Sequence, residues 1–184
     1  MVAALVIGVL AGVGAFVPLQ DLPVSAPDCG TGHAAILVAQ SVPRATMIPC
    51  LASLPAGWQF GGAQVHTNRA RFWLDSDRGG RHAVEVRLTP SCSASPRDRV
   101  PSDEPGTQRF EQPSQLQPRL VDRRVYLFPG GCVTYDFTFS PGAPSSLIFA
   151  VDSAVSFEPR ATLVSSVRRA QGLELCGAGG RCPG

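Results

Sequence analysis

Residues 69–89 alternate between polar and apolar side chains on both sides of a glycine pair, Gly79 and Gly80. Side chains of a β-strand point to opposite faces in turn, so this period of two predicts two strands. The glycines predict a tight turn between them, because glycine adopts positive φ angles without steric cost. The segment is therefore expected to form an antiparallel hairpin with one apolar face and one polar face.

The alternation also predicts which side chains share a face. Trp73 is expected on the polar face, opposite the core. The apolar face is expected to carry Ala70, Phe72, Leu74, Val84, Val86 and Leu88.

The register of this hairpin stays open between two alternatives that keep both apolar sets on one face. One pairs Leu74 with Val84, which leaves a short glycine loop but sets Arg71 opposite Arg87. The other pairs Leu74 with His82, which sets Arg71 opposite a glutamate. Turn geometry favours the first register and charge pairing favours the second.

Residues 125–139 predict a second hairpin of the same design. Its turn is Pro129-Gly130-Gly131, in which proline presets the first turn position and glycine supplies positive φ. Residues 58–67 read as a glycine-interrupted strand. The long polar segment 91–117 is expected to be a loop with a short edge strand at 108–111. The apolar face of the second hairpin is expected to carry Val133, Tyr135, Phe137 and Phe139.

Helices are predicted at both ends of this strand-rich part. Residues 33–42 read as a helix with Thr31 as its N-cap. Residues 145–157 are apolar without a clear period and are assigned to a helix, and residues 159–170 form a better one, with arginines in its last turn. The predicted fold is α+β: an antiparallel sheet built from two glycine-turn hairpins, packed by an N-terminal helix and C-terminal helices, and stabilised by disulfides.

The chain has six cysteines and no Cys-x-x-Cys pair. An even number of widely spaced cysteines behind an apolar N-terminus is typical of disulfides in an oxidising compartment, with free buried thiols as the alternative. The pairs expected from position are Cys29 with Cys50, Cys92 with Cys132, and Cys176 with Cys182.

The N-terminus is a run of apolar residues without a charged side chain. Residues 1–19 would form a helix roughly 28 Å long, enough to cross a bilayer. We therefore predict a transmembrane or signal-anchor segment at 1–19, a linker at 20–31, a single extracytoplasmic α+β domain at 32–176 and a flexible tail at 177–184. The expected location is the cell membrane, as a single-pass protein, or outside it after cleavage.

The sequence carries no complete motif for a metal, a cofactor or nucleic acid. Asp75-Ser76-Asp77 imitates the start of a calcium loop, but Val86 stands where the bidentate glutamate belongs. His33 follows Cys29 at ligand spacing without a second pair to complete a tetrahedral site. The net charge is +2 and the basic residues, all arginine, are scattered, which is not the pattern of a nucleic-acid-binding protein.

These features favour a non-enzymatic binding or accessory domain of the cell envelope, whose partner is an envelope protein or a cell-wall component. Trp73 and Trp58 are the candidate contact residues, Trp73 being the better one because it is expected on the polar face. The alternative is a small envelope hydrolase that uses His66 or His82.

Three segments resemble a family of uncharacterised actinobacterial proteins that are membrane-anchored or exported. They are residues 48–58 (IPCLASLPAGW), 72–78 (FWLDSDR) and 126–135 (YLFPGGCVTY). The resemblance implies one N-terminal membrane segment followed by an extracytoplasmic domain. It implies no activity and no functional residues.

Overall fold

The computed structural model describes residues 25–94, 98–115, 118 and 120–177, which form two antiparallel sheets and three helices. The large sheet has seven strands in the order β2-β3-β4-β8-β7-β6-β5, and β1 pairs with β9 in a small one. This confirms the predicted α+β class. The helices are α1 (His33–Ser41), α2 (Leu147–Ala154) and α3 (Arg160–Gln171), and the strands are β1 (Met47–Leu51), β2 (Trp58–His66), β3 (Arg69–Ser76), β4 (Gly80–Thr89), β5 (Asp98–Val100), β6 (Gln108–Gln115), β7 (Val121–Phe128), β8 (Gly131–Thr138) and β9 (Val155–Pro159).

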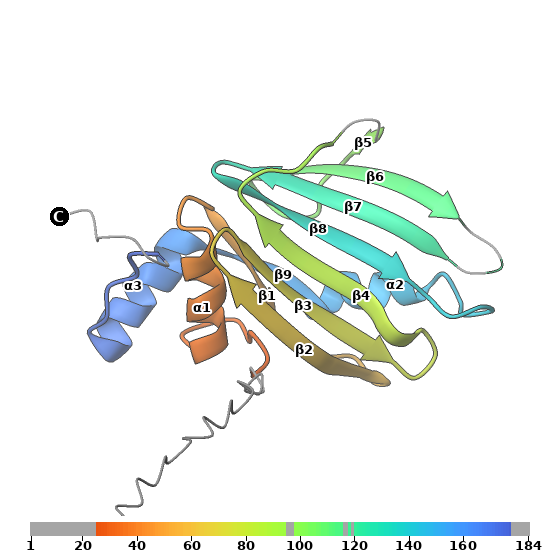
Figure 1. Cartoon of the computed structure of the whole chain (residues 1–184), viewed down its shortest axis with the longest axis horizontal. Coiled ribbons are helices and arrows are strands. Elements are labelled where there is room, and N and C mark those ends of the chain that lie inside the picture. Colours follow the sequence, from red (N-terminus) through yellow and green to blue (C-terminus); the bar gives the residue numbers. More distant parts are fainter. Residues whose placement is uncertain (1–24, 95–97, 116–117, 119, 178–184) are drawn as a thin grey trace, which may run out of the picture.

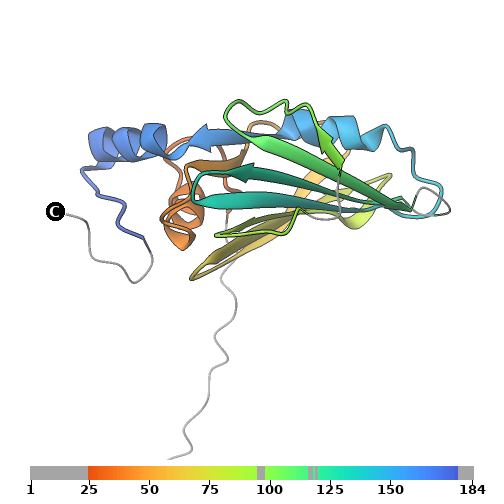
Figure 2. The same cartoon turned by 90° about the horizontal axis from the view of Figure 1, so that it is seen from above.

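Among the described residues, the small sheet and the helices lie over one face of the large sheet. β1, β9 and α2 form a second layer over that face, and α1 packs beside them against β1, β2 and β3 (Figure 2). Figure 1 looks onto the other face, where no described helix covers the strands. The predicted apolar sets of both hairpins lie on the covered face and are buried, as the alternation required.

The β3–β4 hairpin adopts the register that pairs Leu74 with Val84, so Arg71 faces Arg87. Near the turn the register shifts, and Ser76 pairs with Gly80. The Ser76 hydroxyl accepts hydrogen bonds from the backbone N–H groups that follow it, at 3.1 Å from Gly79 and 3.3 Å from the residue before. Turn geometry therefore decides the register, in agreement with the small energy of a single cross-strand charge pair.

The second hairpin, β7–β8, docks its turn onto the segment between α1 and β1. The carbonyl of Pro129 accepts hydrogen bonds from the backbone N–H of Thr46 at 3.1 Å and from its hydroxyl at 2.9 Å. Gly130 has a φ of 77°, and a Cβ atom there would lie 1.7 Å from the carbonyl oxygen of Arg44. This turn thus requires glycine both for its backbone conformation and for the close approach.

Three local predictions were wrong in detail. Thr31 is not the cap of α1: the N-cap is Gly32, which offers no side-chain hydrogen bond. Helix α2 ends at Ala154, and the next residues extend into β9 because they find a partner in β1. Residues 108–111 belong to β6, an eight-residue strand inside the sheet, and the edge is the three-residue β5.

Two of the three predicted disulfides are present in the described residues. Cys29 and Cys50 have Cα atoms 4.9 Å apart, and Cys92 and Cys132 have Cα atoms 6.1 Å apart. Loop closures of 21 and 40 residues correspond to about 3 and about 4 kcal/mol of stabilisation on the chain-entropy model. The predicted partner of Cys176, Cys182, lies outside the described residues, so that pairing stays a prediction.

The Cys92–Cys132 bond holds a long connection in place. The chain leaves β4 and passes β8, β7 and β6 before it pairs again as β5 at the far edge. The bond ties Cys92, near the start of this connection, to Cys132, the second residue of β8. Thr134 Oγ1 lies 3.5 Å from Cys92 Sγ. The segment that the bond closes contains this crossing together with β5, β6 and β7, so the bond restricts all of them in the unfolded chain.

The described part of the predicted linker is held against the domain. The carbonyl of Pro27 accepts a hydrogen bond from the backbone N–H of Leu51 at 2.9 Å, and Gly30 donates its N–H to Glu158 Oε2 at 3.1 Å. The predicted membrane segment 1–19 lies outside the described residues, as do residues 178–184 of the predicted tail. Within the part of the chain that the structure describes, no helix is long and apolar enough to cross a membrane.

Candidate functional site

The uncovered face of the large sheet carries Trp73, as the alternation predicted. Its ring lies over β2 at two consecutive glycines, where a Cβ on Gly61 would come within 2.5 Å of the ring and one on Gly62 within 2.6 Å. Gly61 is the extra residue of a β-bulge, since Phe60 pairs with Leu74 and Gly62 with Trp73. The bulge and the glycines together make a shelf on which the indole rests, half-buried.

His82 borders the same shelf. Its ring centroid lies 5.1 Å from that of Trp73, and its φ of 50° is in the left-handed region. Asp75 stabilises this backbone conformation, because its Oδ1 accepts a hydrogen bond from the His82 backbone N–H at 2.7 Å. Asp75 and His82 therefore shape the surface beside the indole, and the Asp75 carboxylate is occupied by its hydrogen bond to the His82 backbone.

A row of charged side chains continues this face across four strands. Glu85 lies between Arg71 and Arg87 and pairs with both, at 3.3 Å from Arg71 Nη1 and closer to Arg87. Asp136 in turn pairs with Arg87 at 3.4 Å and with Arg123. The two arginines set opposite each other by the register are thus compensated diagonally. We name these five residues the outer charge row.

The other predicted site residues lie apart from this surface or inside the core. Trp58 is buried, with its ring 6.4 Å from that of Phe139, so it packs the core and offers no contact surface. His66 is exposed at the end of β2, and His33 is exposed at the start of α1. Among the described residues, no group of three or more histidine, cysteine or acidic side chains has the arrangement of a metal site.

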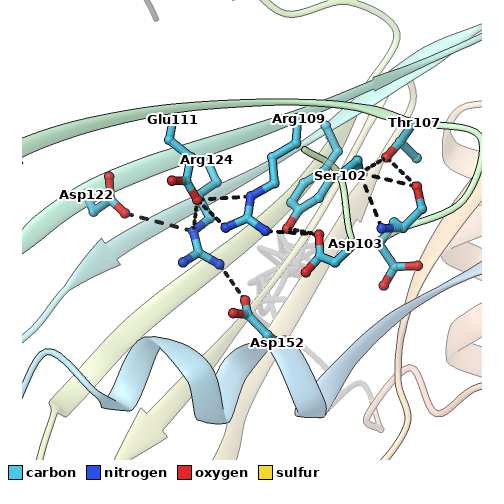
Figure 3. Close-up of polar contacts among 10 residues, drawn as sticks. Ser102, Asp103, Thr107, Arg109, Glu111, Asp122, Arg124 and Asp152 are labelled. Atoms are coloured by element: carbon cyan, nitrogen blue, oxygen red, sulfur yellow. Dashed lines mark hydrogen bonds and ion pairs between the residues drawn. The ribbon is translucent and has the colours of Figure 1, made fainter. Parts of the chain in front are cut away.

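A second charged group lies on the covered face and was not among the predicted site residues (Figure 3). Arg124 of β7 is its centre, with a side chain only 6% exposed. Its Nη1 donates a hydrogen bond to Asp152 of α2 at 2.5 Å. Its Nε lies 2.8 Å from Glu111 Oε1 without the alignment of a hydrogen bond, and 4.0 Å from Asp122 Oδ2. We call Arg124, Arg109, Glu111, Asp122, Asp152 and Asp103 the inner charge cluster.

Arg109 links the cluster to the loop between β5 and β6. It pairs with Glu111 and lies 3.1 Å from Asp103 Oδ1, which also accepts a hydrogen bond from the Tyr126 hydroxyl at 3.2 Å. The loop is braced by a 2.6 Å hydrogen bond between the hydroxyls of Ser102 and Thr107. The cluster therefore joins three parts of the chain: this loop, the β6–β7 pair and α2 (Figure 3).

Burial is the largest influence on the pKa of two carboxyl groups in the cluster. It raises the pKa of Asp152 and outweighs the opposing effect of the Arg124 guanidinium. It also raises the pKa of Asp122, against the Arg123 backbone N–H and Arg124, which both lower it. The Asp122 and Asp152 carboxyl groups therefore have a raised pKa and hold their protons more tightly than exposed aspartic acids do, chiefly because burial disfavours the charged form.

The inner charge cluster was missed because the β7 strand was predicted to begin too late. β7 starts at Val121, so Asp122 and Arg124 alternate with Val125 and share the covered face with Tyr126. Period-two alternation through 121–128 would have placed them there, although charged residues on a strand normally indicate a solvated face. One counter-charge of Arg124 is Asp152, which is distant in the sequence.

Comparison with known proteins finds no matching family model, no matching curated protein and no matching solved structure. The resemblance of segments 48–58, 72–78 and 126–135 to actinobacterial envelope proteins therefore stays a prediction.

The inner charge cluster predicts a large difference between two adjacent arginines. Replacing Arg124 by Met leaves buried carboxylates without their counter-charge, and we expect a loss of about 3 kcal/mol in the free energy of unfolding. Replacing Arg123 by Met, on the opposite face with a side chain 46% exposed, is expected to cost less than about 1 kcal/mol. Urea denaturation measures both, and equal losses would contradict the assignment of Arg124 as the centre of the cluster.

The raised pKa of Asp122 predicts a pH-dependent gain for Asp122→Asn. A raised folded-state pKa means that stability is present below the unfolded pKa and is lost as pH rises through the folded one. Asparagine does not titrate, so the stability of the variant relative to wild type should increase as pH rises above about 4. Thermal unfolding between pH 3 and 8 measures this difference. Asp98→Asn, at an exposed site, is the control, and a difference that falls with pH would refute the expectation.

Proposed function

We propose that this protein is an extracytoplasmic domain of the cell envelope that binds an envelope protein or a cell-wall component. In this proposal residues 1–19 anchor it in the membrane or are removed on export. Support for the compartment comes from the disulfides Cys29–Cys50 and Cys92–Cys132, since such bonds persist in oxidising compartments and are rare in the cytosol.

The observation that carries the binding proposal is the position of Trp73 on an uncovered sheet face. An aromatic ring that is half-buried on a glycine shelf is held in place before it meets a partner, so binding costs little side-chain entropy. Large aromatic residues of this kind are over-represented among the residues that dominate binding energy. The outer charge row supplies a polar border beside the indole. A polar rim around an aromatic contact is typical of protein interfaces, and its charged groups can orient a partner.

The geometry does not favour the hydrolase alternative. In the described part of the chain, neither the His66 nor the His82 side chain is hydrogen-bonded to a serine or an aspartate, and both residues are exposed on strands. A histidine acting as a general base needs a nucleophile within hydrogen-bond reach and a partner to orient it. We therefore propose binding rather than hydrolysis.

The compartment is tested by thiol counting on protein isolated from the envelope of its own cells. We expect Cys29, Cys50, Cys92 and Cys132 to resist alkylation until a reductant is added, because all four are disulfide-bonded. Mass spectrometry of the alkylated protein identifies each position. Free thiols at these four positions would remove the support for an extracytoplasmic location.

The binding surface is tested by replacing Trp73 with alanine in the whole chain, solubilised in mild detergent. We expect co-sedimentation with purified sacculi, or with membrane vesicles from the same cells, to weaken by about tenfold or more, the loss typical of a central aromatic contact.

Trp58→Phe is the matched control, because Trp58 is buried and its replacement should leave binding unchanged. It also leaves Trp73 as the only tryptophan, since the chain has two. The fluorescence of Trp73 in this variant should then change when the protein binds sacculi or membrane vesicles. If Trp73→Ala binds like wild type, the proposed surface is wrong.

A further inference from the structure

The two edges of the large sheet differ in how they are protected. An edge strand presents unpaired backbone N–H and C=O groups, and proteins usually shorten such strands or place charges or prolines on them. β5 follows this rule, because it has three residues and two of them, Asp98 and Arg99, are charged and exposed. β2 does not follow it: it has nine residues, WQFGGAQVH, with neither an acidic nor an arginine side chain nor a proline.

Within the described residues, the backbone of β2 has no strand partner along its outer side. β3 is its one strand partner among the described elements, and Figure 1 shows β2 as the outermost strand. Apart from the Trp58 N–H at its start, no described backbone bond joins β2 to another segment. The groups that face away from β3 are therefore available to a further strand.

Apolar side chains along this edge are left partly exposed. Phe60, Ala63 and Val65 lie on the covered face of the sheet and pack against the core, but none of them is fully buried. An added strand would continue the covered face and remove their remaining surface from water. The edge thus offers both unsatisfied backbone groups and incompletely buried apolar groups.

We propose that β2 pairs antiparallel with β2 of a second copy of this chain. A two-fold interface brings every residue near its axis close to its own copy, so a charged strand would repel itself there. β2 itself carries no acidic or arginine side chain. Arg71 of β3 donates hydrogen bonds to Gln64 Oε1 at 2.6 and 3.1 Å, and its charge is compensated by Glu85 at 3.3 Å. β3, with Arg69, Arg71 and Asp75, would not meet this condition.

The bulge determines where the axis lies. Regular pairing of β2 with β3 runs from Gly62 to His66, and the middle of this stretch is Gln64. A two-fold axis at Gln64 sets Ala63 of one copy beside Val65 of the other, so the partly exposed apolar groups meet across the junction. The two sheets then join into one continuous sheet with two covered faces on the same side.

The proposal is tested with Gln64→Cys in the whole chain. The variant is expressed in cells, and isolated membranes are treated with a short thiol-to-thiol cross-linker. Directly opposite residues have Cβ atoms about 5 Å apart, so we expect a product of twice the chain mass. Gln59→Cys is the matched control: it is the same substitution on the same strand, exposed. Its two copies would lie roughly 30 Å apart and should not cross-link.

Val65→Lys in the Gln64→Cys background places one positive charge on each side of the axis, and we expect it to lower the yield of the dimer by about tenfold. Retained melting temperature and unreactive native cysteines show that this variant is folded. Should Gln64→Cys be poorly folded, Ala63→Cys and Val65→Cys chains with different tags, expressed together, must cross-link to each other instead. Equal yields for Gln64→Cys and Gln59→Cys, an unchanged yield with Val65→Lys, or a product of any other mass would overturn the proposal.

Discussion

The fold depends on the contact of one side chain, Phe157 of β9, with the large sheet. Its ring centroid lies 5.0 Å from that of Tyr126, 6.2 Å from that of Phe128 and 6.3 Å from that of Tyr135. Edge-to-face arrangements at these distances are favourable beyond the burial of apolar area. Because β9 is the strand that pairs with β1, this cluster fastens the small sheet to the large one and decides which face is covered.

The consequence is that the chain uses charge in two ways on the two faces of one sheet. The outer charge row lies on a face open to water, where each ion pair contributes little and repulsion between facing arginines is easily compensated. The inner charge cluster is enclosed by α2 and a loop, where desolvation is costly and removal of one partner leaves the others uncompensated. Arg123 and Arg124 are neighbours in sequence, but the charge of Arg123 is solvated on the outer face and that of Arg124 is buried on the covered face.

Local patterns in the sequence predicted what local physics controls. Alternation placed Trp73 opposite Phe72 and Leu74, and the glycine turns placed both hairpins, because strand period and positive φ act within a few residues. The sequence predicts helix at residues 155–157, because nothing nearby in the chain reveals their strand partner β1, which is about a hundred positions away. The cluster around Arg124 also depends on a distant contact, because its counter-charges include Asp152 of α2 as well as Glu111 and Asp122 on the strands.

β2 carries both the glycine shelf under Trp73 and the unpaired sheet edge, each on a different half of the strand. The bulged half supplies Gly61 and Gly62, on which the indole of Trp73 rests. The regular half, up to His66, is the part with a free edge in good register. A strand added to the regular half would stiffen the backbone that the glycines belong to, because Gly62 is shared by both halves. The proposed pairing between copies and the proposed contact at Trp73 would thus be connected through Gly62, which cannot carry a side chain without displacing the ring.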